Sequence, residues 1–147
     1  MQTDAWLNQD QHFAPGRELF GSDRRFKVWV YSVGHSQLLL RSELAENAPR
    51  IDVLFKPVEA MQTGMIYDGL VIRCATAEER ARITADTGRF GRSDRVHMPE
   101  SADDRTDYVI SAAVGWATDD DDVRAPSRLA SFAPAGDPTR ILPTEGA

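Results

Sequence analysis

The most conspicuous group of side chains that could do chemistry in this 147-residue sequence is a run of four carboxylates, Asp119 to Asp122. An EF-hand calcium loop needs spaced ligands, a glycine at its sixth position and a glutamate at its twelfth. Counted from Asp119, those positions hold Arg124 and Ala130. Weak calcium binding is an alternative, but the sequence favours a solvated acidic loop, and we predict no dedicated metal site.

A second set of polar residues is spread over the central part of the chain. Arg41, Asp52 and Arg73, with His35, are expected near one mouth of a sheet, where they could bind a polar small molecule or support acid–base chemistry. The sequence shows no serine–carboxylate or cysteine arrangement that would complete a catalytic site with His35. The single cysteine, Cys74, excludes an intramolecular disulfide and is expected as a small buried hydrophobe. We predict no catalytic residue and no cofactor.

The elements that must position these residues are strands, predicted at 26–33, 37–42, 50–56 and 70–75. Side chains alternate between the two faces of a strand. In each segment one set of alternate residues is apolar, which indicates a buried face. Its members are Phe26, Val28, Val30, Leu38, Leu40, Ile51, Val53, Phe55, Leu70, Ile72 and Cys74.

The opposite face of the same strands mixes aromatic, aliphatic and charged residues. We call these eight residues the second face: Trp29, Tyr31, Leu39, Arg41, Asp52, Leu54, Lys56 and Arg73. Trp, Tyr and Arg are enriched where interfaces concentrate their energy, and so much apolar area would be an association liability in water. The chain's own helix, or the segments around 6–20 and 128–132, could cover part of this face. We expect the rest to meet a protein partner or a second copy of the chain.

Local signals refine this outline. Thr76 and Glu79 match a capping box, so a helix is predicted over residues 77–87 and ends before Gly88. Pro57 should mark a bulge, an edge or a strand end. The tripeptide 67–69 is a hairpin-turn signal. A further strand is predicted at 107–117, and a short one around His97.

These elements predict a single α+β domain. Its sheet should be mainly antiparallel, with about five or six strands, a meander at its start and one short helix after the fourth strand. We expect a loosely structured lead-in at 1–25, a core at 26–117, and an acidic loop with a proline-rich tail at 118–147.

Composition limits the function further. The net charge of −6 argues against nucleic-acid binding through a basic surface. No apolar run is long enough for a membrane helix, and the first ten residues lack the pattern of a signal peptide, so a cytoplasmic location is expected. The favoured hypothesis is a binding protein without catalysis, such as an inhibitor or an immunity-type protein. The alternative is an enzyme or small-molecule-binding domain with its polar site near Arg41, Asp52 and Arg73.

Overall fold

The computed structural model describes residues 3–88, 91 and 93–134. In these residues the chain forms seven strands, one short 3-10 helix and one α-helix. In chain order these elements are β1 (Ala5–Leu7), η1 (Asp10–His12), β2 (Glu18–Ser32), β3 (Gln37–Ser42), β4 (Arg50–Gln62), β5 (Ile66–Cys74), α1 (Ala77–Thr87), β6 (Arg95–Glu100) and β7 (Tyr108–Asp119).

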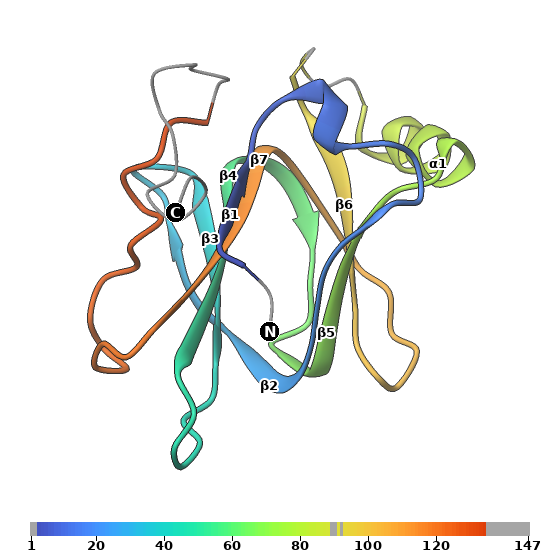
Figure 1. The fold of residues 1–147 in the computed structure, drawn as a ribbon. Helices are drawn as coiled ribbons and strands as arrows, with labels where there is room; N and C mark the ends of the chain where they lie inside the picture. Colours follow the sequence, from blue (N-terminus) through green and yellow to red (C-terminus); the bar gives the residue numbers. More distant parts are fainter. Residues whose placement is uncertain (1–2, 89–90, 92, 135–147) are drawn as a thin grey trace.

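The strands form an antiparallel barrel (Figure 1). Their order is β1-β7-β4-β3-β2-β5-β6, and a pairing between β6 and the first half of β7 closes strands β2 to β7 into a ring. β1 pairs with the second half of the same edge of β7. The meander predicted for β2, β3 and β4 is confirmed. The sheet has seven strands rather than five or six, and the helix follows the fifth strand because β1 was not foreseen.

β2 is much longer than predicted and bends from one side of the barrel to the other (Figure 1). Its first half pairs with β5 and its second half with β3. The predicted lead-in at 1–25 therefore contains β1 and the first eight residues of β2. The sequence hid this strand because Gly21, Ser22 and Asp23 interrupt the alternation, and the β2–β5 register shifts between Ser22 and Arg25.

The hairpin turn predicted at Tyr67–Gly69 is wrong, because these residues lie inside β5. Gly69 has φ +73° and lies opposite the register shift in β2. A glycine is therefore used here for the irregular pairing of two strands, and not for a turn. Pro57 was expected at an irregularity. β4 continues through it, and its pairing with β7 shifts between Val58 and Ala60.

The barrel interior holds the main hydrophobic core. The buried residues that form it are Leu19, Phe20, Phe26, Leu38, Leu40, Val53, Phe55, Tyr67, Leu70, Ile72, Cys74, Val109, Val114 and Trp116. His97 is fully buried beside them, with its ring 5.5 Å from that of Phe13 and 5.6 Å from that of Phe55. Burial lowers the pKa of His97 to about 3, so its imidazole is neutral.

The helix α1 agrees with its prediction. Thr76 accepts a hydrogen bond from the backbone N–H of Glu79, and the Glu79 side chain accepts one from the backbone of Thr76. Ile83 is its one fully buried residue and packs in a small cluster with residues of β6 and β7, at the margin of the barrel. No helix of the described chain is long and apolar enough to cross a membrane.

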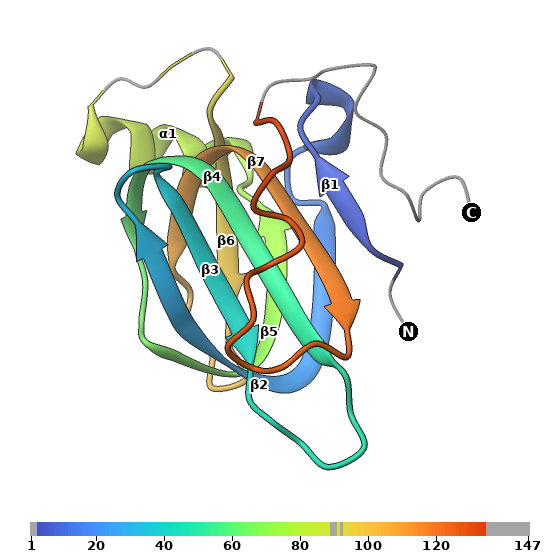
Figure 2. The same ribbon diagram turned by 90° about the vertical axis from the view of Figure 1, so that its left-hand side faces the viewer.

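After β7 the chain turns back and crosses the outer face of β3, β4 and β7 (Figure 2). We call residues 120–133 the strap. The predicted tail at 118–147 thus begins with the end of β7 and continues as the strap. Residues 135–147 of that tail lie outside the described part of the chain.

Candidate functional site

Five of the eight second-face residues lie side by side on the outer face of β3 and β4, and all five are buried. Leu39 lies directly opposite Leu54, and Arg41 directly opposite Asp52, across the β3–β4 pairing. The strap lies over them. The five residues are Leu39, Arg41, Asp52, Leu54 and Lys56.

The charged centre of this face is a pair formed by Arg41 and Asp52. Arg41 donates to both carboxylate oxygens of Asp52, from Nε at 2.7 Å and from Nη2 at 3.0 Å. Its Nη1 donates to the backbone carbonyl of Val123 in the strap, at 2.6 Å. The guanidinium also lies over the ring of Trp29, 5.2 Å from the ring centroid. Arg41 is therefore held by a carboxylate, a carbonyl and an aromatic ring at once.

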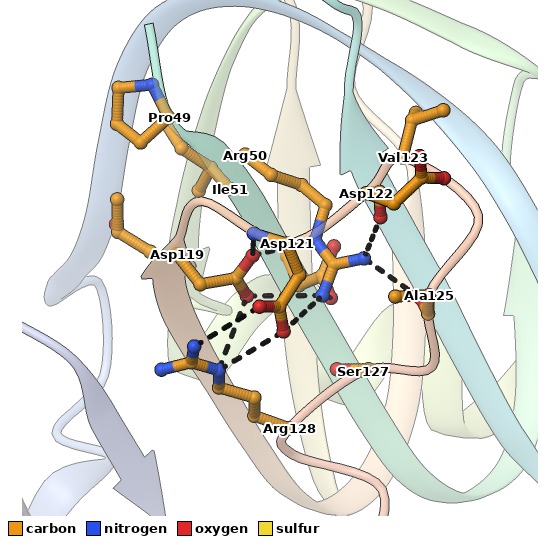
Figure 3. A network of polar contacts seen from close by, with 12 residues as sticks. Pro49, Arg50, Ile51, Asp119, Asp121, Asp122, Val123, Ala125, Ser127 and Arg128 are labelled. Atoms are coloured by element: carbon orange, nitrogen blue, oxygen red, sulfur yellow. Dashed lines mark hydrogen bonds and ion pairs between the residues drawn. The ribbon is translucent and has the colours of Figure 1, made fainter.

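A second arginine, Arg50, fixes the start of the strap (Figure 3). Its Nε lies 3.0 Å from a carboxylate oxygen of Asp119, and its Nη1 donates to the carbonyls of Asp122 and Ala125, both at 2.8 Å. Arg50 was not among the residues predicted for the second face. Alternation back from Asp52 would have placed it on this face, because residues two apart in a strand point the same way.

The acidic run is not the uniformly solvated loop that the sequence predicted. Asp119 is the last residue of β7 and is buried against Arg50. Asp121 accepts hydrogen bonds from Arg128, both at 3.3 Å. Arginines therefore neutralise these carboxylates. Within the described ranges there is no group of three or more His, Cys, Asp or Glu side chains placed to hold a metal ion.

Apolar contacts and two further hydrogen bonds complete the cover. Leu129 of the strap is buried in one cluster with Leu39 and Leu54. Lys56 donates to the carbonyl of Ala130 at 2.7 Å, and the Trp6 indole N–H donates to the carbonyl of Ala133 at 2.8 Å. The expectation that segments near 6–20 and 128–132 could cover the second face is met for this part of it, while α1 packs elsewhere.

A β-bulge separates Trp29 and Tyr31, which simple alternation placed on one face. The β2–β3 register shifts between Val28 and Val30, so Val30 faces the same side as Leu39 and Tyr31 the same side as Leu38. Val30 is consequently 47% exposed instead of buried, and Tyr31 lies on the interior side of the strand near its end. Trp29 stays outside and is 41% exposed.

Arg73 is not near the other polar residues of the second face. It lies on β5 and donates to both carboxylate oxygens of Glu79, at 2.6 and 2.8 Å, with Glu100 at 3.3 Å. The hydrogen bonds from Arg73 lower the pKa of Glu79 to about 2. His35 is exposed at the tip of the β2–β3 loop. The structure thus brings Arg41 and Asp52 together and leaves Arg73 apart, on a strand that pairs with β2 and β6.

Beside the strap, the part of the outer face that remains open forms a groove of about 220 Å³, which we call the Trp29 groove. Its lining includes Trp29 and Val30 of β2 and residues 124–127 of the strap. Leu39 and Leu54 belong to its lining. Four second-face residues therefore contribute to it: Trp29, Leu39, Arg41 and Leu54.

Two polar groups in this groove lack partners in the described chain. The side-chain oxygen of Gln37 is buried without a hydrogen-bond partner. The guanidinium of Arg124 is exposed and forms no ion pair with the carboxylates that the structure describes. A buried acceptor without a donor is unfavourable, so a ligand that supplies an N–H would improve this site.

Comparison with known proteins leaves this surface to be interpreted from its own chemistry. No protein-family model matches the chain, and neither the curated proteins nor the solved structures gave a significant match. The Trp29 groove combines an aromatic wall, an apolar lining, an unpartnered acceptor and a free cation. That combination suits binding of an amphipathic, negatively charged chain segment.

Proposed function

We propose that this chain is a small binding protein that holds an acidic segment of a protein partner in the Trp29 groove. The observation that carries the proposal is the exposure of Trp29 and Val30 beside an apolar hollow in a face otherwise covered by the strap. Aromatic residues next to a pocket are the usual anchors of protein interfaces. An inhibitor or an immunity-type protein would be one form of such a function.

The charges around the groove favour an acidic partner segment, although the whole chain carries −6. Other cations on this face are already engaged, Arg41 by Asp52, Lys27 by Glu43 and Lys56 by the carbonyl of Ala130. Arg124 at the groove has no such counter-ion among the described carboxylates. A carboxylate of the partner would supply the counter-ion of Arg124.

The unpartnered oxygen of Gln37 adds a requirement for a hydrogen-bond donor. An extended peptide presents backbone N–H groups along its length and can place one there while an apolar side chain enters beside Trp29. The proposal includes a cytoplasmic location, which the single, buried cysteine suits because that compartment keeps thiols reduced.

The test uses two labelled pentapeptides, one with phenylalanine between acidic residues and one with phenylalanine between lysines. We expect saturable binding of the acidic peptide by fluorescence anisotropy and at least tenfold weaker binding of the basic one. Trp29→Ala should abolish binding with folding retained, because Trp29 lies outside the barrel core and is 41% exposed. Arg124→Glu should reverse the preference between the two peptides.

Arg82→Glu is the matched control, since it makes the same charge change on the exposed side of α1. It should leave both affinities unchanged. Equal binding of the two peptides, or acidic-peptide binding that survives both Trp29→Ala and Arg124→Glu, would refute the proposal. In the remaining case the occupant of the groove is a second copy of this chain. Light scattering distinguishes that case, because it measures whether the chain is a monomer or a dimer in solution.

A further inference from the structure

A second hollow lies at the end of the barrel where β2 bends and where β4 begins and β7 ends. It has a volume of about 400 Å³, within the range of pockets that hold small molecules. None of the residues that line it belongs to the Trp29 groove. Its lining is Phe20, Gly21, Ser22, Asp23, Arg24, Pro49, Ile51, Trp116 and Thr118.

We call this hollow the mouth cavity. Its inner part is aromatic and apolar. Phe20 and Trp116 are almost fully buried and lie with their ring centroids 5.4 Å apart. Ile51 and Pro49 add aliphatic surface, and Thr118 also belongs to the lining. Such walls accept the apolar body of a ligand.

Arg24 is the cation of the mouth cavity and is satisfied only by neutral groups. Its Nη1 donates to the carbonyl of Pro49 at 2.9 Å. Its Nη2 donates to the carbonyl of Glu43 at 2.9 Å and to the hydroxyl of Ser42 at 3.3 Å. The Glu43 carboxylate lies beside Lys27 instead, at 3.1 Å. Three of the five N–H donors are used, and the positive charge has no counter-ion within the described chain.

This arrangement sets Arg24 apart from the other arginines that are at least partly buried. Each of the other four in the described residues has a carboxylate oxygen within 3.0 Å. These four arginines are Arg41, Arg50, Arg73 and Arg95. A partly buried cation without a counter-ion is costly, and an anion brought by a ligand would remove that cost.

We propose that the mouth cavity binds a small molecule with an aromatic or aliphatic body and one carboxylate, which Arg24 receives. Asp23 lines the same cavity and is exposed, so it would repel a second negative charge on the ligand. The site therefore suits a monocarboxylate. This inference is independent of the Trp29 groove and of its proposed partner.

The test compares two probes of nearly equal shape, 3-phenylpropionate and the neutral 3-phenylpropanamide, by isothermal titration calorimetry and by the NMR signal of the Trp116 indole N–H. We expect saturable binding of the carboxylate with a shift of that signal, and at least tenfold weaker binding of the amide. Arg24→Gln should lower the carboxylate affinity to that of the amide. Arg25→Gln, one residue away and exposed, is the matched control and should change neither affinity.

Because Arg24 also ties β2 to both ends of the β3–β4 connection, Arg24→Gln could fail to fold. Ile51→Trp keeps Arg24 and fills the cavity, and it should abolish binding of both probes. Three outcomes would overturn the inference: no saturable binding of 3-phenylpropionate, equal binding of acid and amide, or binding that Ile51→Trp leaves intact.

Discussion

Arg41 and Asp52 form a two-point ion pair at 2.7 and 3.0 Å on the outer face of the barrel, where each side chain is no more than 1% exposed. They lie directly opposite one another on β3 and β4. Burial removes water from both charges, so Arg41 depends on Asp52 as its counter-ion, while Asp52 also lies 3.7 Å from Nη2 of Arg50. The strap supplies a third partner through the carbonyl of Val123.

Asp52→Asn should therefore be strongly destabilising, since it leaves the Arg41 cation buried without a counter-ion. We expect a loss of roughly 3–5 kcal/mol in the free energy of unfolding, measured in urea. Asp68→Asn is the matched control, because Asp68 pairs with Arg25 at 3.0 Å on the surface. It should cost no more than about 1 kcal/mol. Equal costs would mean that the Arg41–Asp52 pair is solvated.

The strap should depend on its own Leu129, which is 1% exposed and packs with Leu39 and Leu54 of the sheet. Leu129→Ala is expected to cost roughly 2–5 kcal/mol if the strap unfolds together with the barrel. If the strap instead opens by itself, the variant should be cut faster by trypsin after Arg124 and Arg128. Leu44→Ala, at a residue 79% exposed, should change stability by less than about 0.5 kcal/mol and leave cleavage unchanged. A strap whose stability and cleavage both match the wild type would not be held by Leu129.

Local signals were sufficient for much of the barrel interior and for its helix. Alternation placed Leu38, Val53 and Ile72 on one buried face, and all three are inside. The capping pattern at Thr76 gave α1 its correct first residue. These signals depend only on residues close together in the sequence, so they can be interpreted without knowledge of the rest of the fold.

The parts that could not be predicted depend on contacts between distant residues. Closure of the barrel needs β6 to pair with β7, and the strap needs Arg50 to reach carbonyls more than seventy residues away. The bulge at Trp29 adds one residue to β2 without any glycine or proline to mark it. One extra residue reverses the faces beyond it, which is why Val30 and Tyr31 were misplaced.

Charges placed inside the barrel should unfold it. Val53→Asp and Ile72→Asp each bury a carboxylate without a partner at a position that is 0% exposed. Neither variant should show a cooperative melting transition by circular dichroism at neutral pH. Met65→Asp, at a residue 66% exposed, should melt like the wild type. A wild-type melting temperature in either interior variant would show that the strand register is wrong.

Calcium should not stabilise the chain through Asp119 to Asp122. Two of these carboxylates are engaged by arginines, Asp119 by Arg50 and Asp121 by Arg128. Millimolar calcium is expected to change the melting temperature by no more than the scatter between repeats. A saturable rise that alanines at these four positions abolish would contradict this prediction.

The stability of the barrel should depend on pH through His97. Burial lowers the pKa of the folded imidazole to about 3, whereas an unfolded histidine titrates near 6.5. Between these values the unfolded chain binds a proton that the folded chain does not. Stability contributed by the neutral ring is therefore complete above about pH 6.5 and is lost as the pH falls toward 3, by up to about 1.4 kcal/mol per pH unit.

His97→Phe isolates this contribution, because a phenyl ring can fill the space between Phe13 and Phe55 without titrating. Urea unfolding at pH 6.5 and at pH 4.5 should show the wild type losing roughly 2 kcal/mol more than the variant over this interval. Carboxylates titrate in both proteins, so their effect cancels in the comparison. His35→Gln, at the exposed loop tip, should lose as much stability as the wild type. If His97→Phe also loses as much stability as the wild type, His97 is protonated in the folded barrel. His97 would then not be buried between the rings of Phe13 and Phe55 as the distances indicate.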